Sequence, residues 1–142
     1  MSSMPVDCFV DTNILVYAAA GREQEEGKRR RALRIIEDED ISLSAQVLQE
    51  FYVTVTRKIA VPLSPDQAVE WIEELEAFPC LSIGSALVKI AVEVSLEHQI
   101  SYWDAAIVAA AQTLGAPILY SEDLNDEQHY GPVQVRNPFA NG

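Results

Sequence analysis

The sequence predicts a three-layer α/β protein with a central, mainly parallel sheet. Short stretches of β-branched residues alternate along the chain with apolar-patterned helical segments of roughly 10 to 15 residues, which is typical of a parallel sheet covered by helices on both faces. The length of 142 residues and the hydrophobic content of 49% suffice for one core and are small for two. We therefore expect a single domain over residues 1–142.

The first half of the chain begins with a predicted strand, residues 6–10, and continues into a helix. Residues 21–28 are polar and typical of a loop or helix start, whereas residues 29–37 have apolar positions at helical spacing. Residues 41–43 predict a second strand. Ser44 is a typical N-cap for the next helix. The expected core face of that helix consists of Val47, Leu48, Phe51, Tyr52 and Val55.

The second half repeats the alternation after a break at Pro62 and Pro65. Ser101 is placed to cap a helix that Gly115 ends. The predicted elements are, in order, a helix at 66–77, a strand at 80–83, helices at 85–97 and 101–114, a strand at 117–120 and a possible edge strand at 133–135. In such a fold, ligands bind beyond the carboxyl ends of the strands.

Composition limits the kinds of partner the protein can have. Ten Lys and Arg against 22 Asp and Glu give a net charge of −12, so a phosphate ligand requires metal ions or a local basic patch. Cys8 and Cys80 are too few for a disulfide scaffold, and their apolar neighbours favour buried thiols in a reducing compartment. No basic segment precedes Arg22, and no apolar run is long enough to span a bilayer, so we expect a cytoplasmic protein.

Acidic residues follow the predicted strands. Asp11 ends the first strand and Asp123 follows the strand at 117–120, so both lie at the same edge of a parallel sheet. Glu50 and Asp104 lie beside apolar helix positions. Taken one at a time, these acids also fit as turn, cap or solvated residues, and the Ser101–Asp104 spacing is that of a capping box. Together, four carboxylates near apolar sequence favour a cation site.

Four motifs carry a resemblance to a known family. Residues 9–17, which include Asp-Thr-Asn, resemble the opening motif of PIN-domain ribonucleases, particularly VapC-type toxins of toxin–antitoxin pairs. Residues 44–51, 101–111 and 119–124 resemble the second, third and fourth motifs in the right order. The resemblance implies a PIN-like fold over the whole chain.

The resemblance also implies roles for particular residues. Those that match the family's metal-binding acids are Asp11, Glu50, Asp104 and Asp123, and those that match its polar supporting positions are Thr12, Asn13 and Ser121. Glu122 and Asp126 compete with Asp123 for the fourth position. The implied reaction is Mg²⁺- or Mn²⁺-dependent hydrolysis of RNA phosphodiesters that leaves 3′-hydroxyl and 5′-phosphate ends. The implied partners are a cognate antitoxin and a second copy of the chain in a homodimer.

Two other classes of protein share features with this sequence. A non-catalytic PIN fold that binds RNA or protein stays open, whereas a phosphorelay receiver needs a lysine after a late strand and the chain has none beyond Lys89. His98 and His129 lack zinc-ligand spacing. The basic run at 28–31, with Arg34, is interpreted either as an RNA phosphate contact or as a solvated helix face paired with Glu25 and Glu26.

Overall fold

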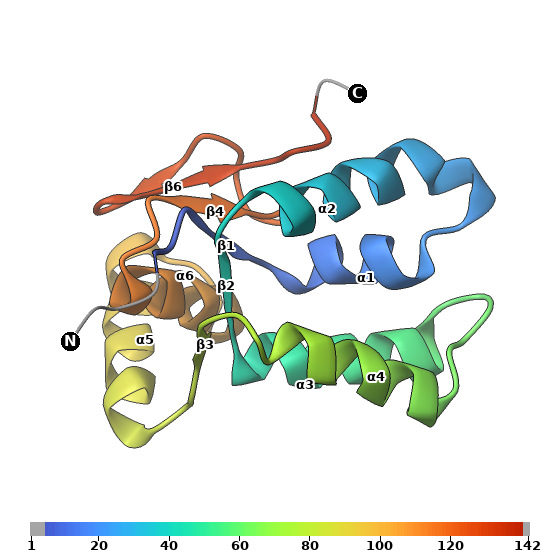
Figure 1. Cartoon of the computed structure of the whole chain (residues 1–142). Helices are drawn as coiled ribbons and strands as arrows, with labels where there is room; N and C mark the ends of the chain where they lie inside the picture. The colour runs from blue at the N-terminus through green and yellow to red at the C-terminus, as the bar shows by residue number, and fades with distance from the viewer. Residues whose placement is uncertain (1–4, 141–142) are drawn as a thin grey trace.

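The computed structural model describes residues 5–140, which form a six-stranded sheet with helices on both faces (Figure 1). The strand order is β3-β2-β1-β4-β6-β5, and every neighbouring pair is parallel except β5 and β6. The strands are β1 (Cys8–Val10), β2 (Ile41–Ser44), β3 (Cys80–Leu81), β4 (Ile118–Tyr120), β5 (His129–Tyr130) and β6 (Val133–Arg136). The predicted α/β class with a mainly parallel sheet is confirmed.

The helices pack in pairs around the sheet, with α1 against α2, α3 against α4 and α5 against α6 (Figure 1). They are α1 (Thr12–Ala20), α2 (Glu26–Asp38), α3 (Ala45–Val53), α4 (Pro65–Leu75), α5 (Ser85–His98) and α6 (Tyr102–Leu114). A 3₁₀ turn, η1 (Glu23–Glu25), precedes α2, and a π turn, η2 (Thr54–Lys58), extends α3. Within residues 5–140, no helix has the length and apolarity needed to cross a bilayer.

The helix ends follow local rules that the sequence already displays. The Ser44 hydroxyl accepts a hydrogen bond from the Val47 amide at 3.4 Å, and the Ser101 hydroxyl accepts one from the Asp104 amide at 3.1 Å. Each serine thereby satisfies an amide that the first helical turn leaves unpaired. Gly115 ends α6 with φ at +73°, a left-handed conformation that glycine adopts without strain. These three predictions are confirmed.

The prediction of an edge strand at 133–135 is wrong in position. β6 lies between β4 and β5, so β5, for which the sequence predicts no strand, forms this edge of the sheet and β3 forms the other. Two residues are too few to display any periodicity, and a tight turn through Gly131 at φ +60° joins β5 to β6. The sheet therefore ends in a short hairpin.

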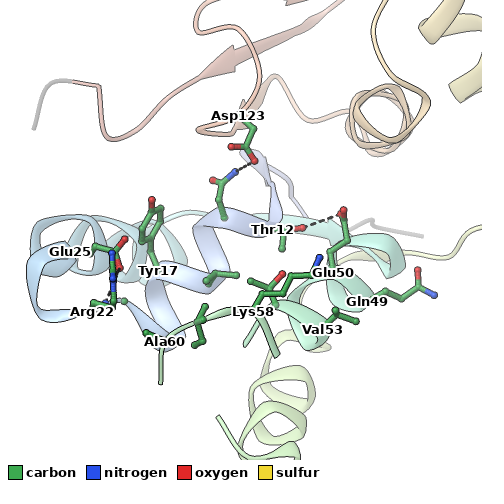
Figure 2. A pocket seen from close by; sticks show the side chains of 16 residues that line it. Thr12, Tyr17, Arg22, Glu25, Gln49, Glu50, Val53, Lys58, Ala60 and Asp123 are labelled. Atoms are coloured by element: carbon green, nitrogen blue, oxygen red, sulfur yellow. Dashed lines mark hydrogen bonds and ion pairs between the residues drawn. The ribbon is translucent and has the colours of Figure 1, made fainter. Parts of the chain in front are cut away.

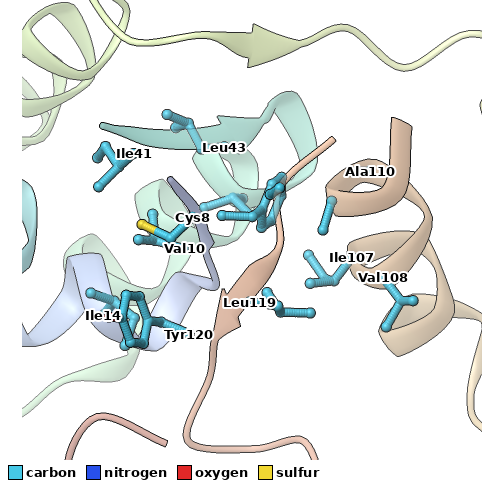
Figure 3. Close-up of a cluster of buried hydrophobic side chains, with 14 of the residues drawn as sticks. Cys8, Val10, Ile14, Ile41, Leu43, Ile107, Val108, Ala110, Leu119 and Tyr120 are labelled. Carbon is cyan, nitrogen blue, oxygen red and sulfur yellow. The ribbon is translucent and has the colours of Figure 1, made fainter. Parts of the chain in front are cut away.

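The centre of the sheet is buried on both faces, as expected for parallel strands. Phe9 on β1 is in register with Leu119 on β4, and Figure 3 shows Ile107 of α6 directed toward Leu119. On the other face, Ile14 of α1 lies beside Tyr120 (Figure 3). β1 is hydrogen-bonded to a neighbour on each side, so the residue that follows it has a fixed position.

The parallel register brings the carboxyl ends of the strands to one edge of the sheet. Val10 pairs with Tyr120, so Asp11 and Ser121 leave adjacent strands at the same level. β2, the neighbour on the other side of β1, continues directly into α3. The helices α1 and α3 therefore start from this edge, where ligand sites of open α/β sheets form.

Candidate functional site

Asp11 is the most deeply buried carboxylate of the site, with 8% of its surface exposed. Its Oδ1 accepts a hydrogen bond from the Thr12 amide at 2.7 Å, and its Oδ2 accepts one from the Ser121 hydroxyl at 2.7 Å. Burial raises the pKa of Asp11 to about 6; the two hydrogen bonds lower it, and the negative charges of Asp123 and Glu50 raise it. The fold thus holds this carboxylate in a buried position, where ionising it costs free energy.

Ser121 joins the loop after β4 to Asp11. Its hydroxyl is fully buried, donates to Asp11 and accepts hydrogen bonds from the amides of Asp123 at 3.1 Å and Leu124 at 3.3 Å. The Asp11 amide in turn donates to the Tyr120 carbonyl at 3.0 Å. One hydroxyl therefore fixes both the buried acid and the backbone that carries Asp123.

Asn13 holds Asp123 from the other side. Its amide nitrogen donates to Asp123 Oδ2 at 3.2 Å (Figure 2), and its amide oxygen accepts from the Glu122 backbone amide at 3.2 Å. Since Asn13 lies in the first turn of α1, it ties that helix to the loop after β4. The predicted supporting position of Asn13 thus has a geometric basis.

Glu50 approaches the site from α3. Its Oε1 accepts a hydrogen bond from the Thr12 hydroxyl at 3.2 Å (Figure 2) and another from the Gln46 side chain at 3.5 Å. Gln46 is buried and also donates to the Trp103 carbonyl at 3.2 Å. It links the Glu50 carboxylate to the first turn of α6, where Asp104 lies.

Three of the four predicted acids, Asp11, Glu50 and Asp123, lie close together at this edge of the sheet, whereas Asp104 is connected to Glu50 only through Gln46 and the Trp103 carbonyl. Asp123 and Glu50 act on the pKa of Asp11, whereas Asp104 is not among its causes. Across residues 5–140, no three His, Cys, Asp or Glu side chains lie close enough together to hold a metal ion as they stand. Carboxylates without a cation repel one another, so neutral donors such as Thr12 and Asn13 separate them.

The chemistry of the donor set nevertheless fits a hard divalent cation. Every predicted ligand offers carboxylate oxygen, the donor that Mg²⁺ and Mn²⁺ prefer, and no predicted ligand offers sulfur or imidazole. A bound cation would also remove the energetic cost of ionising Asp11, which its raised pKa expresses. Asp11, Glu50, Asp104 and Asp123 are the residues that would hold it.

The two acids that compete with Asp123 are engaged elsewhere. Glu122 accepts a hydrogen bond from the Tyr17 hydroxyl at 2.6 Å and forms an ion pair with the Lys28 ammonium. Asp126 accepts from the Asn137 amide at 2.8 Å. Asp123 is thus the acid of this loop that acts on Asp11.

The C-terminal residues 137–139, here called the C-terminal clasp, close over the Glu122 contacts. The Asn137 side chain accepts a hydrogen bond from the Phe139 amide at 2.9 Å, which forms a tight turn. The Phe139 ring meets the Tyr17 ring edge-on, with centroids 5.1 Å apart, and Lys28 Nζ lies 5.6 Å from the Phe139 centroid. The chain end thereby covers the ion pair that holds the loop after β4.

A hollow of about 760 Å³ lies beside the acids, between α1 and the α3–η2 segment. Figure 2 shows Asp123 and Glu50 on one side of it, the Lys58 side chain directed toward Glu50, and Arg22 on the far side. Its lining also includes apolar side chains, which are Val16, Ala20, Val53, Ile59 and Ala60. The hollow is thus acidic on one side, and its walls are partly apolar.

The basic run on α2 is used mainly within the protein. Lys28 pairs with Glu122, and Glu26 pairs with both Arg29 and Arg30 at 3.3 Å. Glu25, expected to pair with this run, instead contacts Arg22. These contacts support the interpretation of the run as a paired helix face.

Sequence reasoning missed the roles of Gln46 and Tyr17. Gln46 stands one helical turn before Glu50 on a helix otherwise facing the core, and a buried glutamine at that spacing is a signal that could have been used. The Tyr17 hydroxyl contacts a residue 105 positions away, which no local pattern reveals.

Fold and site together define a class. A parallel sheet with carboxylates at the carboxyl edge of its central strands is the arrangement of an α/β protein built to bind a cationic or phosphorylated ligand there. The chain matches the family model of the PIN domain over residues 8–129. It therefore belongs to the PIN domain family. No curated protein matches the sequence.

Solved structures agree on the fold. A toxin–antitoxin complex from Klebsiella pneumoniae has a chain with a TM-score of 0.69 at 22% identity, which covers 93% of this chain and 98% of that one. Mycobacterium tuberculosis VapC20, a sarcin–ricin loop cleaving toxin, has a TM-score of 0.64 at 20% sequence identity, and the match covers 82% of this chain and 89% of that one. VapBC2 from Rickettsia felis, bound to a promoter DNA fragment, has a TM-score of 0.62 at 16% sequence identity, and the match covers 92% of this chain and 97% of that one.

Proposed function

We propose that this protein is a metal-dependent endoribonuclease and the toxin component of a VapBC-like pair. One observation carries the proposal: the fold buries Asp11 at the carboxyl edge of the sheet, with Asp123 and Glu50 near enough to raise its pKa. A structural protein gains nothing from such an arrangement, whereas a phosphodiester hydrolase uses it to hold cations. Mg²⁺ or Mn²⁺ is the proposed cofactor.

Each residue contributes through a contact of its own. Asp11, Glu50, Asp104 and Asp123 would bind the ion or ions, and a divalent cation held there supplies Lewis-acid activation of water and charge neutralisation at the scissile phosphate. Ser121 and the Thr12 amide fix both oxygens of Asp11. The Asn13 side chain orients Asp123, and the Thr12 hydroxyl orients Glu50.

The proposed partners follow from the structures with the same fold. One is a toxin–antitoxin complex and another is named a sarcin–ricin loop cleaving toxin, which supports a cognate antitoxin and an RNA substrate for this chain. A homodimer has a suitable surface on α5, where Val88, Val92 and Leu96 are exposed. We also propose that residues 1–142 act as one PIN-like domain in the cytoplasm.

One observation favours a second candidate, a PIN fold that binds RNA or protein without catalysis. Within residues 5–140, the acids form no ready metal group. In this case the four acids bind no ion, and the protein acts through its hollow alone. Metal binding separates the two candidates.

The first experiment is cleavage of a panel of structured and single-stranded RNAs in Mg²⁺, Mn²⁺ or EDTA. The purified protein is compared with an Asp11→Asn, Asp104→Asn double variant, which exposes a contaminating nuclease because contamination survives the substitutions. We expect metal-dependent cutting that the double variant lacks. Absence of both cutting and Mn²⁺ binding contradicts the nuclease and supports the non-catalytic module.

A second prediction concerns the fourth acid. Asp123→Asn should lower the cleavage rate at least tenfold, on the order of 1.4 kcal/mol in the barrier, because Asp123 faces Asp11. Glu122→Gln should leave cleavage nearly unchanged and cost about 0.5 to 1 kcal/mol of stability, since its ion pair with Lys28 is partly exposed. Initial rates and thermal unfolding of both variants test this. Equal losses of rate would make Glu122 the fourth acid.

A further inference from the structure

Two cationic side chains line the hollow, and they differ in what they contact. Arg22 Nε lies 3.6 Å from Glu25 Oε1 and is paired. Lys58 is exposed and forms no ion pair with any residue in the described range 5–140. Figure 2 shows its side chain pointing into the hollow, on the same helical segment as Glu50. Lys58 is therefore an uncommitted positive charge beside an acidic site.

The π turn η2 selects Lys58 rather than Arg57 as a lining residue. Along α3 and the start of η2 the hollow is lined by Gln49 and Glu50, followed one turn later by Val53 and Thr54. In a regular α-helix, both Arg57, seven residues after Glu50, and Lys58, four residues after Thr54, would lie on this face. A π turn takes about one residue more than an α turn, so η2 moves the register forward by one. Lys58 lines the hollow, and Arg57 does not.

The charge of the protein makes a single uncommitted lysine significant. With a net charge of −12, the protein repels a polyanion everywhere except where cations are concentrated. The basic run on α2 is largely taken up by Glu122 and Glu26. Cations at the acids would attract one phosphate, and Lys58 offers a contact for another along the same hollow.

The hollow also limits the kind of nucleic acid that fits. A volume of about 760 Å³ is in the range of pockets for small ligands, which leaves room for a short single-stranded segment and is too small to enclose a duplex. Val16, Val53 and Ile59 give its walls an apolar surface against which unpaired bases can pack.

We propose that Lys58 binds a backbone phosphate of single-stranded RNA, adjacent to the phosphate held at the acids, and that the π turn η2 positions it for this contact. The inference rests on the proposed function, because it takes RNA as the substrate. It adds a phosphate subsite outside the acidic motifs.

The test compares Lys58→Met with Arg57→Met, its neighbour on the same π turn. Arg57 is also exposed but lies outside the hollow, so it is a matched loss of one positive charge. Both substitutions are made in the Asp11→Asn, Asp104→Asn variant, which prevents cleavage. Binding of fluorescein-labelled single-stranded 12-mers is measured by anisotropy in Mg²⁺ over a series of salt concentrations, and thermal unfolding confirms that both variants fold.

We expect Lys58→Met to weaken binding roughly three- to tenfold for every sequence and to reduce the salt slope by about 0.7, as loss of one phosphate contact requires. Arg57→Met should change both quantities far less. In the active protein, Lys58→Met should raise KM more than it lowers kcat. Mn²⁺-induced thermal stabilisation should stay unchanged, because Lys58 is not an ion ligand.

Three outcomes overturn the subsite. These are equal effects of the two substitutions, no effect of Lys58→Met, and no binding of any RNA in the panel. The second outcome leaves the hollow to a protein partner. If wild-type protein cleaves RNA but Lys58→Met behaves like Arg57→Met, only the subsite fails and the nuclease stands. If RNA binding depends on Lys58 and cleavage is absent, the nuclease fails and the subsite stands.

Discussion

In metal-free buffer at pH 7.5, Asp11→Asn is expected to unfold at a higher temperature than the wild type. The pKa of Asp11 is about 6 in the folded protein against an ordinary value of 3.8. The folded state therefore binds more protons than the unfolded state between these values, and stability falls as the pH rises from about 4 through about 6. Replacing the Asp11 carboxylate by a neutral amide should therefore raise the free energy of unfolding by up to about 3 kcal/mol at neutral pH.

Divalent ions should reverse this order. Under the proposed function, Mn²⁺ should bind the folded wild type and stabilise it by mass action, whereas Asp11→Asn would lack a proposed ligand and should respond little. Thermal unfolding at pH 4.5 and 7.5, in EDTA and in Mn²⁺, measures all four conditions. Asp40→Asn, an exposed acid outside the site, serves as the control and should change stability by less than about 0.5 kcal/mol. A wild-type stability in EDTA that does not fall between pH 4.5 and 7.5 relative to that of Asp11→Asn would contradict the raised pKa.

Ser121→Ala should cost about 2 to 4 kcal/mol of stability and at least tenfold in cleavage rate. The substitution leaves two amides without their acceptor, those of Asp123 and Leu124, and deprives Asp11 of a donor. The loop that carries Asp123 then loses its anchor. Urea unfolding and initial cleavage rates measure the two effects.

Ser42→Ala is the matched control for this substitution. Ser42 is also fully buried, on the neighbouring strand β2, but its hydroxyl makes a single hydrogen bond, to the Cys8 carbonyl at 2.9 Å. Loss of this hydrogen bond in Ser42→Ala should cost about 1 kcal/mol of stability and leave the cleavage rate within a factor of two or three of the wild-type rate. If the two alanine variants behave alike, Ser121 is an ordinary buried serine.

The features predicted from the sequence are those that depend on neighbouring residues. Ser44 and Ser101 cap helices through amides three positions away, and Gly115 ends a helix by its own conformation. Asp11 could be placed at the edge of the sheet because a strand and a helix meet there. The resemblance to the PIN motifs then assigned the acids together.

The features that escaped prediction depend on contacts between distant segments. The Tyr17–Glu122 hydrogen bond joins positions 105 apart, and only the folded chain decides that Glu122 faces Lys28 while Asp123 faces Asp11. The π turn η2 escaped because its residues read as ordinary helix. It is nevertheless what selects Lys58 over Arg57 as a lining residue.

The C-terminal clasp has a practical consequence for how the protein is produced. Phe139 packs on Tyr17 and Lys28, which hold the loop that carries Asp123, so we expect a purification tag or fluorescent fusion after the last residue to disturb the position of this loop. β1 begins at Cys8, at the opposite end of the sheet from Asp11. Fusions should therefore be attached at the N-terminus, and an enzyme preparation that carries a C-terminal tag should be compared with the untagged protein before its activity is judged.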